Sequence, residues 1–302
     1  MSPRPSGRSL LKTSLRISGT PVASVDSYLG GEPFAEVIDE PGGLLPYAKK
    51  HLGPLQFADI EAKVSMDAHP VLHRWVRDAW FGNPERDRVV FDSTNLDGSN
   101  PRSLELTRAR IREVELPALD SASLDRHHLT LRIAPRGVKE IRNTPIPRND
   151  RIERDFLGRN FSVGIDGIDC SGIVAVDACK IRTQFPEAGG GKRGTLIFPD
   201  IFIHVDVNHL DVWREWFEDF VIHGNNDDDK ERDGVINYLD PMMTTPLAVL
   251  QIKHLGIYRI AIEAPPPTGP RTAKVFLYCE RMELTTVESG GGDTAPHKPV
   301  TI

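Results

Sequence analysis

The sequence predicts a mainly β protein made of two tandem copies of one domain, each a β-sandwich or partly closed barrel flanked by one α-helix. The first observation behind this prediction is an internal repeat: residues 53–80 and 194–221 align without a gap at a constant offset of 141 positions. The second observation is that most other segments alternate apolar and polar residues, which is the period of a half-buried strand. Together they indicate a duplicated unit dominated by sheet.

Each aligned block reads as a strand followed by a helix. In residues 57–66 and 201–207 the apolar positions alternate, and beyond them apolar residues recur at helical spacing and form one stripe. Asp67 and Asn208 stand at equivalent positions before the helices, and we expect both to be N-caps, since their side-chain oxygens can accept from unpaired amides. The residues expected to form the two cores are Phe57, Ile60, Val64, Trp75, Phe198, Ile201, Val205 and Trp216.

The repeat extends on both sides of this block. Upstream, residues 14–27 parallel residues 160–178, each an alternating strand that ends in a glycine turn; downstream the offset becomes 146. The second copy therefore holds five extra residues, which fall in the polar loop HGNNDDDKERDG. We predict one domain over residues 10–145 and another over 146–287, with a flexible arm at 1–9 and a disordered tail at 288–302 that is rich in Gly, Pro and Thr.

Composition excludes several classes of protein. The 302 residues are 39% hydrophobic and 26% charged, and no apolar run is long enough to span a bilayer, so no membrane span is expected. The net charge of -6 is mild and both signs are scattered, which argues against specific nucleic-acid binding. Three cysteines, none in a CxxC pair, disfavour a disulfide framework and a zinc site and favour a reducing cytoplasm.

The order of elements resembles that of the tail-tube protein family of contractile phage tails and related bacterial injection systems. The resemblance is carried by the I-x-G turns (ISG, IDG), the Gly-rich loop, the F-x-D-I strand, the helix carrying Trp and the final apolar strands. It covers about residues 10–135 and 155–287. It implies a β-hairpin region contributed to a continuous barrel around a channel, with six domains to a ring and rings stacked into a tube.

Two domains in one chain depart from the usual single-domain subunit of that family. Three chains would supply six positions around an axis, so the resemblance implies a trimer with pseudo-sixfold symmetry at the inner tube or at the tube–baseplate junction. The implied partners are further copies of the chain and other tube, spike, hub, sheath or baseplate proteins. The implied location is the cytoplasm, within a phage tail or injection-system particle.

One physical argument for assembly does not depend on the family. Predicted strands such as GTLIFPDIFIHVDV are long and apolar, with little Pro or Lys to protect an exposed edge. A ring of neighbouring copies would cover such edges. The alternative is a non-enzymatic binding or adaptor protein of two β-sandwich domains, which would display an aromatic patch; most tryptophans here are already assigned to helix stripes.

No catalytic residue and no cofactor is predicted, since GxSxG and any motif around a cysteine are missing from the sequence. The run EAGGGKRGT lacks the order of a phosphate-binding loop and is interpreted as a loop. A weak calcium-loop candidate has the EF-hand spacing, although GVINYLD within it is expected to be a strand and Pro241 denies an exit helix. Its four carboxylates are Asp229, Glu231, Asp233 and Asp240.

Overall fold

The first β body is a closed barrel, and it accounts for most of the first half of the chain. The computed structural model describes residues 11–40, 47–95, 99–142, 146, 153–184, 195–264 and 271–286. Six antiparallel strands follow one another in the order β7-β6-β1-β2-β5-β9, and pairing of β7 with β9 closes the ring. Their bounds are β1 (Leu11–Ile17), β2 (Thr20–Leu29), β5 (Ile60–Val64), β6 (Glu85–Asn95), β7 (Arg102–Leu116) and β9 (Leu129–Ala134).

The second β body is a half-barrel of seven strands with the same order of elements. The strands run β11-β16-β17-β18-β15-β12-β8, and β11 does not pair with β12 as β1 pairs with β2, so this sheet stays open. The mainly β fold class predicted from the sequence is confirmed. The bounds are β8 (Leu119–Asp120), β11 (Phe161–Ile165), β12 (Ile173–Val176), β15 (Ile201–Asp206), β16 (Arg232–Leu239), β17 (Pro246–Ile262) and β18 (Thr272–Thr285).

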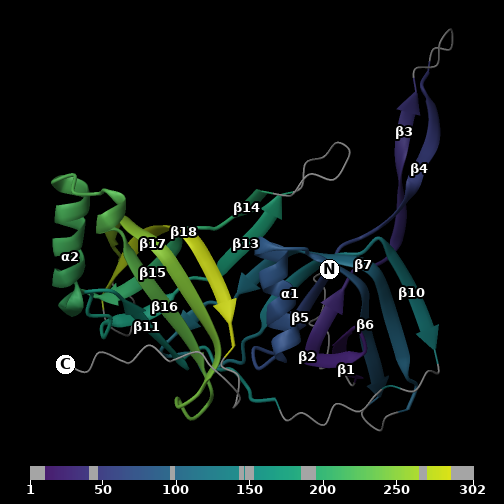
Figure 1. Ribbon diagram of the computed structural model, residues 1–302, viewed down its shortest axis with the longest axis horizontal. Helices are drawn as coiled ribbons and strands as arrows, with labels where there is room; N and C mark the ends of the chain where they lie inside the picture. The colour runs from purple at the N-terminus through teal and green to yellow at the C-terminus, as the bar shows by residue number, and fades with distance from the viewer. Residues whose placement is uncertain are drawn as a thin grey trace.

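Two hairpins leave these bodies and end differently. The hairpin of β3 (Pro33–Glu40) and β4 (Lys49–Phe57) forms a separate two-stranded sheet that projects from the barrel (Figure 1). The hairpin of β13 (Cys179–Gln184) and β14 (Thr195–Ile197) crosses instead to the first body and adds to β7. In the other direction, β8 of the first half pairs with β12 of the second. The two halves of the chain therefore exchange strands.

The strand registers repeat between the bodies, so each position in one has an equivalent in the other. Ile111 opposite Ile133 corresponds to Ile257 opposite Leu277, and both ladders carry a bulge one residue further on. The long strand β18 corresponds to β9 together with β10 (Gly137–Arg142), which pairs with the first half of β7. Pro135 stands at the break, where a residue without an N–H interrupts the ladder.

One helix packs on each body, and its start differs from the prediction. Helix α1 (Pro70–Phe81) begins at a proline and is capped by His69, whose Nδ1 accepts from the Val71 amide at 3.2 Å. Proline suits the first helical position because it needs no hydrogen bond there. The N-cap prediction for Asp67 is therefore wrong; its carboxylate accepts hydrogen bonds from Arg154.

The second helix begins at the position equivalent to the start of α1, three residues after its expected cap. Asn208 lies in the 3₁₀ turn η1 (Val207–His209), capped by Asp206, and α2 (Asp211–Phe217) starts only afterwards. The N-cap prediction for Asn208 is wrong as well. The helix continues as a π turn, η2 (Glu218–Ile222), and a second 3₁₀ turn, η3 (Asp228–Lys230), precedes β16.

The structure places the eight expected core residues in two groups. Ile60, Val64, Trp75, Ile201, Val205 and Trp216 are buried, whereas Phe57 and Phe198 are half-buried where the hairpins join the bodies. Trp75 also donates from Nε1 to the Pro84 carbonyl at 2.8 Å. Within the described part of the chain, neither helix combines the length and the apolar character that crossing a membrane would require.

Candidate assembly interface

The contact between the two bodies is a strand added to a barrel edge. Strand β13 pairs antiparallel with the end of β7, with Cys179 opposite Leu116 and Ile181 opposite Val114. Ile181 is 1% exposed, and Val114 and Leu116 are fully buried. The apolar face of this ladder is therefore continuous with the core of the barrel.

The other face of the same ladder is a set of ion pairs with a clear polarity. Lys180 on β13 lies 3.1 Å from Glu115 and 3.5 Å from Glu113 on β7, and the Arg182 Nε donates to Glu113 at 2.7 Å. The hydrogen bond to Glu115 raises the pKa of Lys180, which strengthens the positive charge of the hairpin. The hairpin is basic here and the edge that receives it is acidic.

The end of helix α1 forms a second part of this contact. Trp80 meets Phe198 edge to face, with ring centroids 6.1 Å apart, and Phe81 lies 6.3 Å from the same ring. Arg281 of β18 stacks on Phe81, with Cζ 4.8 Å from the ring centroid. Figure 1 shows α1 between the two bodies and α2 at the far side of the second.

The second body carries the equivalent edge without a strand on it. Residues Arg259–Ile262 of β17 correspond to Glu113–Leu116 of β7, and they pair with β18 on one side. On the other side no strand of the described chain pairs with them, because β16 reaches only Leu255. Ile262 is 46% exposed, whereas its equivalent Leu116 is fully buried.

The helix end of the second body is exposed in the same way. Val221 and Ile222 occupy the positions of Trp80 and Phe81 in the repeat. Their exposed fractions are 38% and 65%, against 8% for Trp80, which the second body covers, and 41% for Phe81. The second body therefore presents, uncovered, both parts of the surface that the first body uses to hold its neighbour.

The projecting hairpin is the counterpart of β13–β14. Its exposed apolar side chains form an unusual concentration for a free strand pair; they are Phe34, Val37, Ile38, Leu52 and Leu55. The registers against β4 and β5 place Glu32 at the position of Lys180 and Phe34 at that of Arg182. The chain thus has one hairpin and one edge in contact, and one of each left open.

The four carboxylates of the calcium candidate do not share one coordination sphere. Asp229 contacts Lys230 at 3.2 Å, and Asp233 accepts from Lys253 at 2.6 Å. Asp240 lies at the far end of β16, roughly 30 Å along an extended strand from Glu231. There it accepts from the amides of the turn after β16, the largest cause of its lowered pKa being the Thr244 amide.

Of the four expected carboxylates, Glu231 lies in a cluster with two residues that were not expected. Ligating atoms of Glu231, His254 and Glu280 lie within 4.8 Å of one another. The Glu231 carboxylate already accepts from Tyr278 at 2.7 Å and lies 2.9 Å from His254 Nδ1. Its equivalent in the first body is Glu85, which binds two arginines, so in both repeats a carboxylate at this position contacts a basic side chain.

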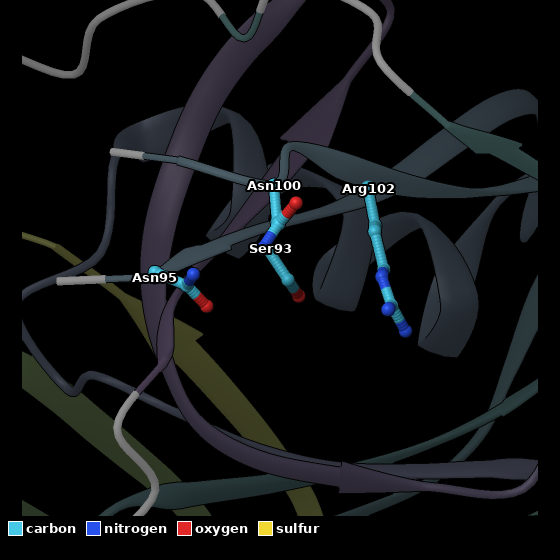
Figure 2. A pocket seen from close by; sticks show the side chains of 4 residues that line it. All are labelled: Ser93, Asn95, Asn100 and Arg102. Atoms are coloured by element: carbon cyan, nitrogen blue, oxygen red, sulfur yellow. The ribbon is translucent and has the colours of Figure 1, made fainter. Parts of the chain in front are cut away.

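A shallow polar pocket lies beside the connection between β6 and β7. Figure 2 shows Ser93, Asn95, Asn100 and Arg102 around it. The Ser93 hydroxyl is hydrogen-bonded to Thr13 at 3.1 Å, and Asn95 donates to the Ser99 hydroxyl at 2.8 Å. The described lining offers hydrogen bonds and one positive charge, and it gives Ser93 no base that would make it a nucleophile.

The repeat was predicted from the sequence, whereas the strand exchange was not. The pattern of an apolar strand does not determine whether it pairs in its own body or in the neighbouring one. One signal was present: Lys180 and Arg182 in one hairpin stand against Glu32 and Phe34 in the other, a change of charge at repeated positions. The loop EAGGGKRGT, both terminal segments and residues 41–46 lie outside the described residues, apart from Thr195 at the start of β14.

No protein-family model and no curated protein matches the sequence. Among solved structures, the chain is similar to a chain in the cryo-EM structure of the anti-feeding prophage (AFP) baseplate, six-fold symmetrised. The two share 13% identity with a TM-score of 0.30, over 47% of this chain and 99% of that one. A likeness at this level carries no argument about function.

Proposed function

We propose that the protein is a structural component of a contractile injection system or phage tail, at the inner tube or at the tube–baseplate junction. In this role it has no catalytic duty and assembles into a ring around a channel. The proposal rests on the element order and tandem repeat that resemble tail-tube proteins, and on the physical state of the strand edges.

The observation that carries the proposal is that one body-to-body contact is satisfied inside the chain while its equivalents stay open. The second body's hairpin lies on β7, and the first body's hairpin and the end of β17 have no strand partner among the described residues. Donor and acceptor are different surfaces, so copies would join head to tail. Such heterologous contacts close into rings when the rotation per step permits, and otherwise extend as filaments.

Three chains are the favoured number. If the step from one chain to the next repeats the step between the two bodies, six bodies in a pseudo-sixfold ring correspond to three chains. Other tube, hub, spike, sheath or baseplate proteins would then stack on the two faces of the ring, and the particle would be assembled in the cytoplasm.

Size measurement and electron microscopy of the purified full-length chain test the proposal. Mass photometry across a concentration series is expected to show a species of three chains, and negative-stain images are expected to show rings with a central hole. A chain that remains monomeric at high concentration and with its neighbours' products present would refute it. A saturable glycan or protein ligand without assembly would favour the adaptor alternative.

A further inference from the structure

We propose that residues Glu32–Phe34 of one copy add as an antiparallel strand to Arg259–Ala261 of the next copy, in a contact whose charge polarity is the reverse of the one inside the chain. This inference rests on the proposed ring and names the surfaces that would join its chains. It also assigns Glu32 and Arg259 as the pair that decides which hairpin enters which edge.

The register follows from the internal contact. Inside the chain, Cys179 lies opposite Leu116 and Arg182 opposite Glu113. The equivalent residues are Gly31 for Cys179 and Ile262 for Leu116, as the repeated ladders on β5 and β15 and on β9 and β18 establish. The repeat therefore sets Gly31 opposite Ile262, Glu32 opposite Ala261, Pro33 opposite Ile260 and Phe34 opposite Arg259.

The apolar face of the open edge needs a cover. Ile260 is half-buried and Ile262 is 46% exposed, although Val114 and Leu116 at the same positions are fully buried under β13. Exposed apolar strand edges invite pairing with another chain. Pro33 of the incoming hairpin would lie over Ile260 as Ile181 lies over Val114. Gly31 is buried against Ile60 of its own barrel and brings no side chain to Ile262.

The charged face reverses its sign between the two contacts. The internal contact places a basic hairpin residue, Lys180, diagonally 3.5 Å from Glu113. At the open contact the same diagonal joins Glu32 to Arg259, both exposed. Complementary charges select partners mainly by penalising the wrong ones. A hairpin carrying Glu32 would face Glu113 and Glu115 on β7, and one carrying Arg182 would face Arg259 on β17.

Aromatic contacts would add to this selection. Arg259 stacks on Phe276 with Cζ 4.9 Å from the ring centroid, and Tyr258 lies edge to face with Phe276 at 5.9 Å. Phe34, 42% exposed on the free hairpin, would be set opposite Arg259 beside this cluster. An arginine between two rings gains from both faces.

The backbone of the hairpin fits an edge strand from Pro33 onward, whereas Gly31 before it has φ 87°. The Glu32 carbonyl accepts from Ala58 on the β4 side, so successive residues alternate and Pro33 faces the open side. Proline there can accept one ladder hydrogen bond and cannot donate one, which is tolerated at an edge. Glu32 and Ala261 would then form a non-hydrogen-bonded pair, in which Cα atoms approach to about 4.5 Å.

Disulfide trapping in the full chain tests this register. Oxidation of a Glu32→Cys/Ala261→Cys variant is expected to join chains covalently and produce a closed covalent trimer on non-reducing gels. The matched control is Lys180→Cys/Glu115→Cys, directly opposite residues of the internal contact, which should cross-link within one chain. The parent chain, with its three native cysteines, sets the background.

Charge reversal tests the assigned pair independently. Glu32→Arg and Arg259→Glu are each expected to weaken association about tenfold or more, and the double variant is expected to recover most of the loss. Lys50→Glu, on the same hairpin outside the paired segment, is expected to leave association unchanged.

The outcomes separate this inference from the proposed function. Rings that form without the 32–261 cross-link, or that ignore both charge reversals, overturn the inference and leave the ring itself standing. A cross-link that forms within single chains also overturns it. Absence of any assembly, with the 180–115 control cross-linking normally, overturns both.

Discussion

The ends of β7 and β17 are the same piece of structure in two states, one covered by a strand and one bare. β7 pairs with β9 and β17 pairs with β18 in the same register and with a bulge at the same place. The covered edge has fully buried Val114 and Leu116 and acidic Glu113; the bare edge has exposed Ile262 and basic Arg259. The repeat has therefore kept its backbone at this place while the side chains and their burial differ between the two bodies.

Removing the covering strand's apolar anchor is expected to have the largest effect on this comparison. Ile181→Asp places a charge at a position 1% exposed, opposite buried Val114, and should lower the free energy of unfolding by about 3 kcal/mol or more. Urea unfolding at low protein concentration measures it. The matched variant Ile262→Asp, on the bare edge, should change the stability of the monomer by no more than about 0.5 kcal/mol.

If Ile181→Asp and Ile262→Asp lower the free energy of unfolding equally, the ends of β7 and β17 do not differ in whether a strand covers them. An equal and large loss would mean that Ile262 is covered within the monomer. An equal and small loss would mean that β13 does not hold the two bodies together.

The turn that carries the free hairpin out of the barrel is the next most sensitive place. Gly30 has φ 101°, and a Cβ there would lie 2.0 Å from the Asp59 carbonyl oxygen. Its equivalent in the other hairpin is Ala178, so the two hairpins leave their bodies by different backbone paths. Gly30→Ala is expected to lower the free energy of unfolding by about 2–3 kcal/mol, because of the left-handed backbone and the clash with the Asp59 carbonyl.

Gly19→Ala separates the two causes, because Gly19 has φ 91° with nothing within 4 Å of a Cβ. Thermal unfolding of this variant should show only the left-handed penalty of about 1–2 kcal/mol. A loss for Gly30→Ala no larger than for Gly19→Ala would show that the Asp59 carbonyl moves aside freely.

The features that could be predicted from the sequence are those that show as a periodic pattern within one segment. The alternating strands, the Trp-bearing helices and the duplication follow from periodicity, which is a property of one segment at a time. The strand exchange does not follow from periodicity, because the alternating pattern of a strand such as Cys179–Gln184 is compatible with pairing in either body. The helix starts were also predicted wrongly. Asp67 is a residue type that often caps helices, but α1 begins at Pro70 and the Asp67 carboxylate binds Arg154 instead.

The open hairpin and the open strand edge could be predicted from the sequence only in part. The unprotected strand edges indicated that neighbours were needed, without saying which edge was already covered. That assignment depends on the pairing of β13 with β7, which joins residues far apart in the chain. Once the pairing is known, the charges at positions 32, 113, 180 and 259 become informative, and they were in the sequence from the start.

The carboxylate near the bulge of β7 gives a third comparison between the bodies. Hydrogen bonding by Arg108, with help from Arg110, lowers the pKa of Glu85 in the folded protein. A lowered folded pKa contributes stability above the carboxyl's ordinary pKa, and that stability is lost as the pH falls through the folded value. Glu85→Gln should therefore cost about 1 kcal/mol at neutral pH and progressively less below about pH 4.

Unfolding midpoints in urea between neutral pH and acid measure the change. The conservative control is Glu140→Gln, whose carboxylate pairs with Arg142 entirely at the surface and should cost less. A Glu85→Gln penalty that stays constant down to acid pH would show that packing around the side chain, and not its charge, matters.

The smallest expected effect concerns the same position in the second body, where a histidine replaces an arginine. Arg108 and His254 are equivalent, with φ 50° and 57°, and each contacts its carboxylate, Glu85 or Glu231. Arginine keeps its charge at any physiological pH, whereas a histidine is charged only when protonated.

His254→Arg fits a backbone that already holds an arginine in the other repeat. The substitution should stabilise the protein by about 0.5 kcal/mol near pH 8, because the arginine holds a permanent positive charge beside Glu231. His51→Arg, beside exposed Glu40 at 3.9 Å, is the control and should gain less stability. A loss of stability at pH 8 for His254→Arg would mean that Glu231 depends on the imidazole's shape and its contact with Tyr278, and that the two bodies differ here in packing as well as in charge.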